Sequence, residues 1–189
     1  MMEIKIIDAK HKENINIPNQ PFPLFGRMIP SYTDGTWSYG VERFSHETLM
    51  CFPDESYDYD AMCKNSIFIG AYDGDICIGL AIMQHAFFEY MYDLKVNAEY
   101  RRRGIAKRLL DKAGEIALAE KYIGIYTQGQ DNNLGACLFY IQSGFCIGGF
   151  DSNIYQGTKQ EGKADIIFYR DCWTTTQDSC INADSTRAD

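Results

Sequence analysis

The apolar pattern of this chain changes its period between residues 66 and 117, and this change limits the folds open to it. Three β-rich runs fill residues 66–97, and an Asp-Gly turn at 73–75 joins the first two, which is a strong hairpin signal. Beyond Gly104 the apolar residues recur on one helical face as far as Ala117, as they do in an amphipathic helix. The sequence therefore predicts a set of strands that leads directly into a helix.

The rest of the chain continues this alternation of strands and helices. The expected elements are strands over 3–8, 66–72, 76–84, 87–97, 122–128, 145–155 and 164–170, and helices over 105–117 and 133–142. This order makes a mixed α/β (α+β) fold, which we expect to form a single domain over residues 1–172. Residues 173–189 are polar and lack apolar periodicity, so we expect a disordered C-terminal tail there.

Residues 15–40 differ from the rest in composition. They hold four of the five prolines of the chain, and proline at this density excludes a long helix. Aromatic side chains alternate with these prolines, among them Phe22, Trp37 and Tyr39. One interpretation is an irregular segment that packs on the core. The other is that Phe22, Trp37 and Tyr39 line a substrate pocket.

Acidic residues outnumber basic residues by 26 to 18, which gives a formal net charge of −8. This sign disfavours a general binder of nucleic acid or of anionic membranes, because the long-range field repels phosphate. It favours a small cationic partner. Acidic residues concentrate at 54–60, where tyrosines separate them. This segment is either a solvated loop or an acidic lip, with Asp54 and Glu55, that attracts a cationic acceptor.

The cysteine and histidine content bears on compartment and metal binding. Seven cysteines occur without a C-x-x-C pair, and the N-terminus has the pattern of a strand and not of a signal peptide. Free thiols in a reducing cytoplasm are the simplest account. The three histidines lack the spacing of metal ligands, so we expect no metal site. No apolar stretch approaches the roughly 18 residues that span a bilayer, and the sequence allows a homodimer without determining the oligomeric state.

A basic cluster lies where the third β-rich run passes into the helix. Six of the twelve residues from 101 to 112 are Lys or Arg, and only Asp111 is acidic. Gly104 stands at the helix start, where unsatisfied backbone N–H groups and the helix dipole favour an anion. The Walker and G-x-G-x-x-G fingerprints are absent. The cluster is therefore either an exposed basic helix face or a phosphate site of another kind.

Two motifs around this cluster resemble the GNAT acetyltransferase superfamily. Arg101-x-x-Gly104-x-Ala106 follows the family pattern [QR]-x-x-G-x-[GA] between a strand and a helix, and residues 133–145 (N-x-x-A-x-x-F-Y-x-x-x-G-F) are similar to a later motif of the family. The resemblance implies a central mixed, mostly antiparallel sheet flanked by helices, with a V-shaped splay between the fourth and fifth strands. It also implies acetyl-CoA as the co-substrate.

The same resemblance implies which residues contact acetyl-CoA. Backbone groups of the strand 87–96 hold the acetyl carbonyl and the pantetheine arm, and the loop and helix start that follow hold the pyrophosphate. The cofactor-binding residues expected on this basis are Leu94, Lys95, Val96, Arg101, Arg102, Arg103, Gly104, Ile105, Ala106, Lys107 and Asn133. Most of these expected contacts involve the backbone.

The resemblance also implies the groups that move protons. Tyr140 matches the family's general acid, which returns a proton to the CoA sulfur, and a phenol is protonated at neutral pH. Asp93 is the candidate base, and a chain of water molecules is the alternative. Glu89 is a second carboxylate on the same strand and a candidate substrate-binding residue. Strand alternation places Asp93 and Glu89 on one face, together with Met91 and Lys95.

A narrower resemblance covers residues 15–172 and points to the streptothricin acetyltransferases. It rests on the segments 21–30, 92–96, 130–133 and 136–140 and on Trp37. This resemblance implies acetylation of the β-lysine amine of streptothricin, which confers antibiotic resistance. Two alternatives stay open at the level of the sequence. One is acetylation of another amine, such as a polyamine, an amino acid or a protein N-terminus, and the other is a non-catalytic acyl-CoA sensor.

Overall fold

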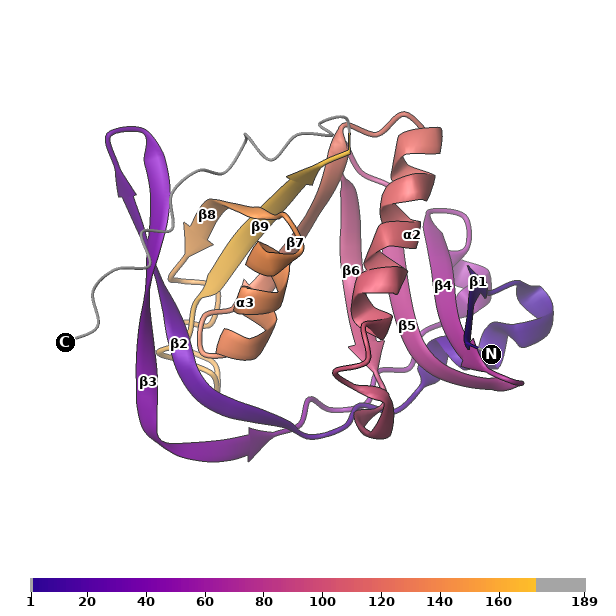
Figure 1. The fold of residues 1–189 in the computed structure, drawn as a ribbon, viewed down its shortest axis with the longest axis horizontal. Helices are drawn as coiled ribbons and strands as arrows, with labels where there is room; N and C mark the ends of the chain where they lie inside the picture. The colour runs from indigo at the N-terminus through magenta and orange to yellow at the C-terminus, as the bar shows by residue number, and fades with distance from the viewer. Residues whose placement is uncertain (1, 173–189) are drawn as a thin grey trace. The chain divides into compact units, whose positions relative to one another are not determined.

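The computed structural model describes residues 2–172 (Figure 1). The elements are β1 (Met2–Ile6), the 3₁₀ segment η1 (Ala9–Asn16), β2 (Phe22–Thr33), β3 (Thr36–Met50), α1 (Tyr59–Met62), β4 (Ser66–Asp73), β5 (Ile76–Gln84), β6 (Glu89–Val96), the 3₁₀ turn η2 (Ala98–Tyr100), α2 (Ile105–Ala119), β7 (Gly124–Gln130), α3 (Leu134–Gln142), β8 (Cys146–Asp151) and β9 (Asp165–Asp171). Seven strands form one sheet in the order β1-β4-β5-β6-β7-β9-β8, and β2 and β3 form a second, two-stranded sheet. The predicted tail at 173–189 lies outside the described residues.

The strand pairings confirm the predicted mixed sheet. The pairs β1–β4, β4–β5, β5–β6 and β8–β9 are antiparallel. The pair β6–β7 is parallel, with register partners Glu89↔Ile125 and Tyr90↔Tyr126. Parallel neighbours need a crossover connection, and α2 supplies it between these two strands. Two register pairs are few for strands of eight and seven residues, as expected of strands that splay apart.

The chain forms two compact units, which are described separately. The first unit consists of the N-terminal segment as far as Phe22 and of Leu49–Thr127, and the second consists of Pro23–Thr48 and of the chain from Gln128 onward. The first unit holds the strands β1, β4, β5 and β6 with α2. The second unit holds α3, β8, β9 and the greater part of the β2–β3 ribbon.

In the first unit, α2 covers one face of β4, β5 and β6 (Figure 1). Its buried side chains are Ile105, Leu109, Leu110, Ala113 and Ala117, which confirms the helical face predicted from the sequence. Gly79 on β5 allows the close approach, because a Cβ there would lie 3.3 Å from Leu109 Cδ1 and 3.2 Å from the Lys95 carbonyl oxygen. The opposite face carries an apolar cluster with η1, whose buried members are Ile7, Ile15, Phe68, Tyr72, Cys77, Leu80 and Ile82.

A β-bulge in β6 corrects one prediction from the sequence. Along β5, Ile82 pairs with Asp93 while the next residue, Met83, pairs with Met91, so Tyr92 is the extra residue. Paired residues of an antiparallel sheet share a face. Asp93 therefore lies on the face of Ile82 and the η1 cluster, and Met91 lies on the face of Met83, toward α2. Strict alternation, which placed Glu89, Met91, Asp93 and Lys95 on one face, is wrong because a bulge reverses the alternation.

The segment 15–40 also differs from the prediction of an irregular segment. Its greater part forms β2 and the first residues of β3, which make a ribbon in the second unit (Figure 1). Asp34 and Gly35 connect the two strands with positive φ angles of 50° and 81°, as a two-residue hairpin turn requires. The prolines are tolerated because a two-stranded ribbon has only edge strands. The Asp-Gly dipeptide was the sequence signal for this turn.

Two further expectations can be compared with the described residues. Cys51, Cys63, Cys77 and Cys137 are free thiols, as expected, whereas the expectation is wrong at Cys146, which is disulfide-bonded. Between residues 2 and 172, no helix has the length and apolarity needed to cross a membrane.

The β2–β3 ribbon has one position that tolerates no side chain. Gly26 pairs with Asn133, and a Cβ on Gly26 would collide with the Glu42 carbonyl oxygen and lie 2.8 Å from Leu134 Cδ2. We expect Gly26→Ala to lower the free energy of unfolding by about 1–3 kcal/mol, which is the usual cost of overpacking. Thermal denaturation measures this loss. Gly40→Ala is the control on β3, since a Cβ there meets nothing within 4 Å, and an equal loss in both variants would contradict the steric explanation.

Candidate functional site

The loop that joins β6 to α2 presents an uncapped helix N-terminus. Gly104 is the N-cap of α2 in a left-handed conformation, φ 77° and ψ 5°, and no side chain caps the helix there. Arg102 also has a positive φ, 62°, which is uncommon for a residue other than glycine. The first N–H groups of an α-helix lack intrahelical acceptors, and the dipole makes this end positive. The start of α2, with Ile105, Ala106 and Lys107, can therefore bind an anion.

Arg101 shapes this loop through three hydrogen bonds to backbone carbonyl groups. Its Nε donates to the Val96 oxygen at 3.0 Å, its Nη2 to the Gln20 oxygen at 3.0 Å, and its Nη1 to the Pro21 oxygen at 2.5 Å. The guanidinium thus ties the loop to the end of β6 and to the segment before β2. Its donors face carbonyl oxygens within the first unit, which makes Arg101 a positioning residue in this structure.

The other basic side chains of the cluster lie at the surface. Arg102 and Arg103 are exposed, and the Arg103 guanidinium lies 5.3 Å from the ring centroid of Tyr100. Lys107 forms an ion pair with Asp111 at 2.8 Å, one helical turn along α2. The positive charge that remains beside the α2 N-terminus therefore comes mainly from Arg102 and Arg103.

Leu94 and Val96, whose backbone groups were predicted to hold the cofactor, lie on β6 beyond the bulge. Leu94 pairs with Ala81, and Val96 pairs with Gly79, so both side chains point toward α2. The Val96 carbonyl oxygen accepts the hydrogen bond from Arg101. That carbonyl therefore already supports the loop.

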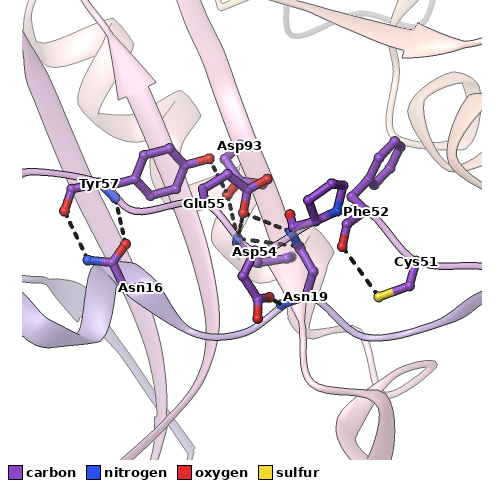
Figure 2. Close-up of polar contacts among 10 residues, drawn as sticks. Asn16, Asn19, Cys51, Phe52, Asp54, Glu55, Tyr57 and Asp93 are labelled. Atoms are coloured by element: carbon purple, nitrogen blue, oxygen red, sulfur yellow. Dashed lines mark hydrogen bonds and ion pairs between the residues drawn. The ribbon is translucent and has the colours of Figure 1, made fainter. Parts of the chain in front are cut away.

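A polar network on the other face of β6 surrounds the ammonium group of Lys95. Figure 2 shows three members of this network, Glu55, Tyr57 and Asp93. Lys95 Nζ lies 3.0 Å from Asp93 Oδ2, 2.8 Å from Glu55 Oε2 and 3.4 Å from Asn19 Oδ1. The hydroxyl of Tyr57 donates to Asp93 Oδ2 at 3.1 Å. The Lys95 side chain is only 12% exposed, so its charge is held by these neighbours and not by bulk water.

The surroundings shift the pKa values of the network in definite directions. Burial raises the pKa of Asp93, and the Lys95 ammonium opposes that shift only in part. Burial lowers the pKa of Lys95, but Asp93 and Glu55 more than offset this, so the net shift of the Lys95 pKa is upward. Burial, followed by the charges of Asp93 and Glu55, raises the pKa of Tyr57. Tyr57 and Lys95 therefore both keep their protons at neutral pH, and Asp93 accepts from both.

The acidic segment 54–60 is ordered by its own side chains. Asp54 accepts from the backbone N–H of Asn19 at 2.6 Å, and Glu55 accepts from the side-chain Nδ2 of Asn19 at 2.8 Å. Asp58 caps the short helix α1, and Asp60 forms an ion pair with Lys12 at 2.7 Å. Glu55 is the member of the segment that reaches Lys95. Asp54 and Glu55, both candidate substrate-binding residues, are thus anchored to the loop before β2.

Glu89 lies apart from this network, toward α2. It is 1% exposed, and His85 Nδ1 lies 3.3 Å from each of its carboxylate oxygens. The His85 ring stacks on Tyr122 with centroids 5.7 Å apart and planes at 4°. Burial raises the pKa of Glu89, against the effect of His85. The structure therefore does not bring Glu89 together with Asp93.

A row of four tyrosine rings, which the sequence analysis missed, continues from the polar network. Tyr57 and Tyr92 are 5.9 Å apart at 69°, Tyr92 and Tyr90 are 5.8 Å apart at 86°, and Tyr90 and Tyr126 stack at 4.6 Å and 19°. We call this set the tyrosine row. Tyr90 and Tyr126 are register partners of the parallel pair β6–β7. The sequence signal for this row was the pair of tyrosines at 90 and 92 in the strand predicted over 87–97.

In the second unit, Tyr140 and Asn133 belong to α3. Tyr140 is 9% exposed, and its ring packs against Phe139, Phe145 and Phe168 with centroids 5.6, 5.6 and 5.2 Å away. Asn133 Oδ1 accepts from the Ala136 amide at 3.2 Å and caps the helix. The aromatic residues predicted to line a pocket are divided between the units. Phe22 packs on Phe52 at 5.3 Å in the first unit, whereas Trp37 and Tyr39 lie on β3 in the second.

Comparison with known proteins identifies a family and several relatives that this chain resembles. The profile of the Acetyltransferase (GNAT) family matches residues 37–145. Streptothricin acetyltransferase A of Bacillus subtilis (strain 168) is 32% identical over 161 residues, which are 83% of this chain and 92% of the relative. A streptothricin acetyltransferase of Escherichia coli is 27% identical over 116 residues, 61% of this chain and 65% of that protein.

Among solved structures, one from Bacillus anthracis str. Ames superposes with a TM-score of 0.80 at 26% identity. The match covers 90% of this chain and 98% of the other. That structure is described as a candidate streptothricin acetyltransferase in complex with acetyl coenzyme A.

Proposed function

Since this chain belongs to the GNAT acetyltransferase family, whose members use acetyl-CoA, we propose that it acetylates the β-lysine amine of streptothricin and thereby confers resistance. The observation that carries the choice of acceptor is the 32% identity to streptothricin acetyltransferase A over 83% of the chain. The net charge of −8 and the carboxylates of Asp93 and Glu55 suit a polycationic substrate. The cytoplasm, where acetyl-CoA is available, is the compartment that we propose.

The α2 N-terminus fits the diphosphate of acetyl-CoA. Its uncapped N–H groups at Ile105, Ala106 and Lys107 would donate to phosphate oxygens, and the exposed side chains of Arg102 and Arg103 add positive charge. Gly104 leaves open space on the loop, since a Cβ there would meet nothing within 4 Å. Arg101 holds the loop that presents these donors through its hydrogen bonds to backbone carbonyl oxygens. By family resemblance, the backbone of Leu94 and Val96 and the side chain of Asn133 would hold the pantetheine arm.

The reaction needs a neutral amine and a proton for the departing sulfur. Acetyl-CoA supplies an activated acetyl group as a thioester. Asp93 is the proton acceptor that we assign to the amine, because its raised pKa brings its basicity closer to neutral pH. Tyr140 is the proton donor to the sulfur by family resemblance. The bulge at Tyr92 alters the backbone next to Asp93, and such bulges often occur beside active sites.

An acetyl-CoA consumption assay with purified protein tests the proposed function. We expect turnover with streptothricin, a product that has gained one acetyl group at the β-lysine amine, and a kcat/KM well above that for polyamines or N-terminal peptides. A preference for one of those amines would replace the proposed acceptor. Acetyl-CoA binding without turnover of any amine would contradict an enzymatic role and point to a sensor.

The diphosphate assignment predicts that Gly104→Asp weakens acetyl-CoA binding by at least about 100-fold. The bulk and negative charge of the new side chain would keep the diphosphate from the helix N–H groups, and more than one charge-assisted hydrogen bond would be lost. Calorimetry with acetyl-CoA measures this. Gly74→Asp is the matched control, because Gly74 also has a positive φ, 62°, and open space around it, but lies in the β4–β5 turn. Equal affinity of the two variants for acetyl-CoA would contradict the assignment.

The assignment of Tyr140 predicts that Tyr140→Phe lowers kcat by roughly 10²–10⁴ while acetyl-CoA affinity stays within error. The ring keeps its contacts with Phe145 and Phe168, and only the hydroxyl is lost. Tyr155→Phe is the control in the same unit, because it removes a hydroxyl that bonds Asp165 at 2.8 Å. If Tyr140→Phe turns over as fast as this control, Tyr140 has only a packing role.

A further inference from the structure

The first unit holds one of its own ammonium groups, that of Lys95, against an aromatic ring and two carboxylates. Lys95 Nζ lies 5.5 Å from the ring centroid of Tyr57 and within 3.0 Å of both Asp93 Oδ2 and Glu55 Oε2. The face of an aromatic ring attracts a cation, and the attraction grows when the cation is withdrawn from water. A ring and two carboxylates therefore make a site whose chemistry selects an alkylammonium ion.

The charges of this site do not cancel. Asp93 and Glu55 contribute two negative charges and Lys95 one positive charge, while the Tyr57 phenol stays neutral because its pKa is raised. The site thus keeps a net negative charge at one end of the tyrosine row. A second cation brought to that end would be attracted, and it would meet Asp93, the residue to which we assign the proton of the acceptor amine.

The tyrosine row leads away from this site through two edge-to-face ring contacts and one stacked pair. It starts at Tyr57 beside Asp93 and passes along β6 through Tyr92 and Tyr90 to Tyr126 on β7. Tyr92, the extra residue of the bulge, is 45% exposed although it belongs to a central strand. An exposed tyrosine ring such as Tyr92 offers apolar surface to methylene groups and a negative face to an ammonium group.

We propose that the tyrosine row binds the aliphatic ammonium chain of the acceptor, with its reacting amine at Asp93 and its methylene groups along Tyr92 and Tyr90. The inference rests on the proposed function and adds the residues that select an extended alkylammonium chain over a compact or neutral amine. Tyr92 is the specificity-determining residue, because it is the exposed ring next to Asp93. The Lys95–Glu55 pair holds Asp93 in place and is a positioning device.

The test is a calorimetric titration of streptothricin into the protein saturated with CoA. We expect Tyr92→Leu to weaken streptothricin binding by about 3- to 30-fold, the range that a cation–ring contact provides between exposed and desolvated sites, since the amine bound at Asp93 lies next to the Tyr92 ring. Tyr92→Phe keeps the ring and is expected to stay within about twofold of the unmodified protein. Phe150→Leu on β8 is the control, since Phe150 is an aromatic residue of similar exposure, 43%, and we expect no change. CoA affinity, measured separately, should be the same in all variants.

Each result has a definite consequence. Tight streptothricin binding by Tyr92→Leu overturns the tyrosine row as the acceptor surface and leaves the proposed function standing, provided that the unmodified protein acetylates streptothricin. Equal weakening in Tyr92→Phe and Tyr92→Leu also overturns it, because the hydroxyl and not the ring face would then be responsible. If the unmodified protein neither binds nor acetylates streptothricin, the proposed function fails and the inference fails with it.

Discussion

The bulge at Tyr92 is the constraint on which the candidate site depends. A regular β6 would turn Glu89, Met91, Asp93 and Lys95 to one face of the sheet. With one extra residue opposite the Ile82–Met83 step, Met91 faces α2 while Asp93 faces η1. The two carboxylates of the strand are thereby separated. Glu89 pairs with His85 on the face toward α2. Asp93 joins Lys95, Glu55 and Tyr57 on the face toward η1. One inserted residue decides which carboxylate shares a face with Lys95, Glu55 and Tyr57.

The basic cluster is best understood through its backbone. Six basic residues in twelve suggest that side-chain charge binds the anion. Arg101, however, donates its hydrogen bonds to the carbonyl oxygens of Val96, Gln20 and Pro21. Lys107 is paired with Asp111. The groups left to attract an anion are the uncapped start of α2, set by the left-handed Gly104, and the exposed side chains of Arg102 and Arg103. The arginine of the motif, Arg101, therefore positions the loop, and the loop presents the amide groups of the helix start.

The sequence predicted the parts of this structure that follow from local patterns. The strands of 66–97, the apolar face of α2 and the two GNAT motifs all depend on residues close together in the chain, and all were recovered. The β2–β3 ribbon was missed because prolines outweighed the Asp34-Gly35 turn. The bulge could not be predicted, since it arises from the pairing of β6 with β5 and leaves no mark in β6 itself. The tyrosine row needed the register Tyr90↔Tyr126 between strands that α2 separates in sequence.

The network around Lys95 is hard to explain by stability alone. Withdrawing charged groups from water is expensive, and replacing a buried ion pair by apolar residues is often neutral or stabilising. Here two carboxylates and one ammonium are held close together, with Lys95 only 12% exposed, and the charges do not sum to zero. An apolar core could fill this space at lower cost, but it could not hold a carboxylate with a raised pKa beside a row of tyrosine rings. This cost supports the proposal that the surface receives a second ammonium group, with Lys95 fixing the position of Asp93 in advance.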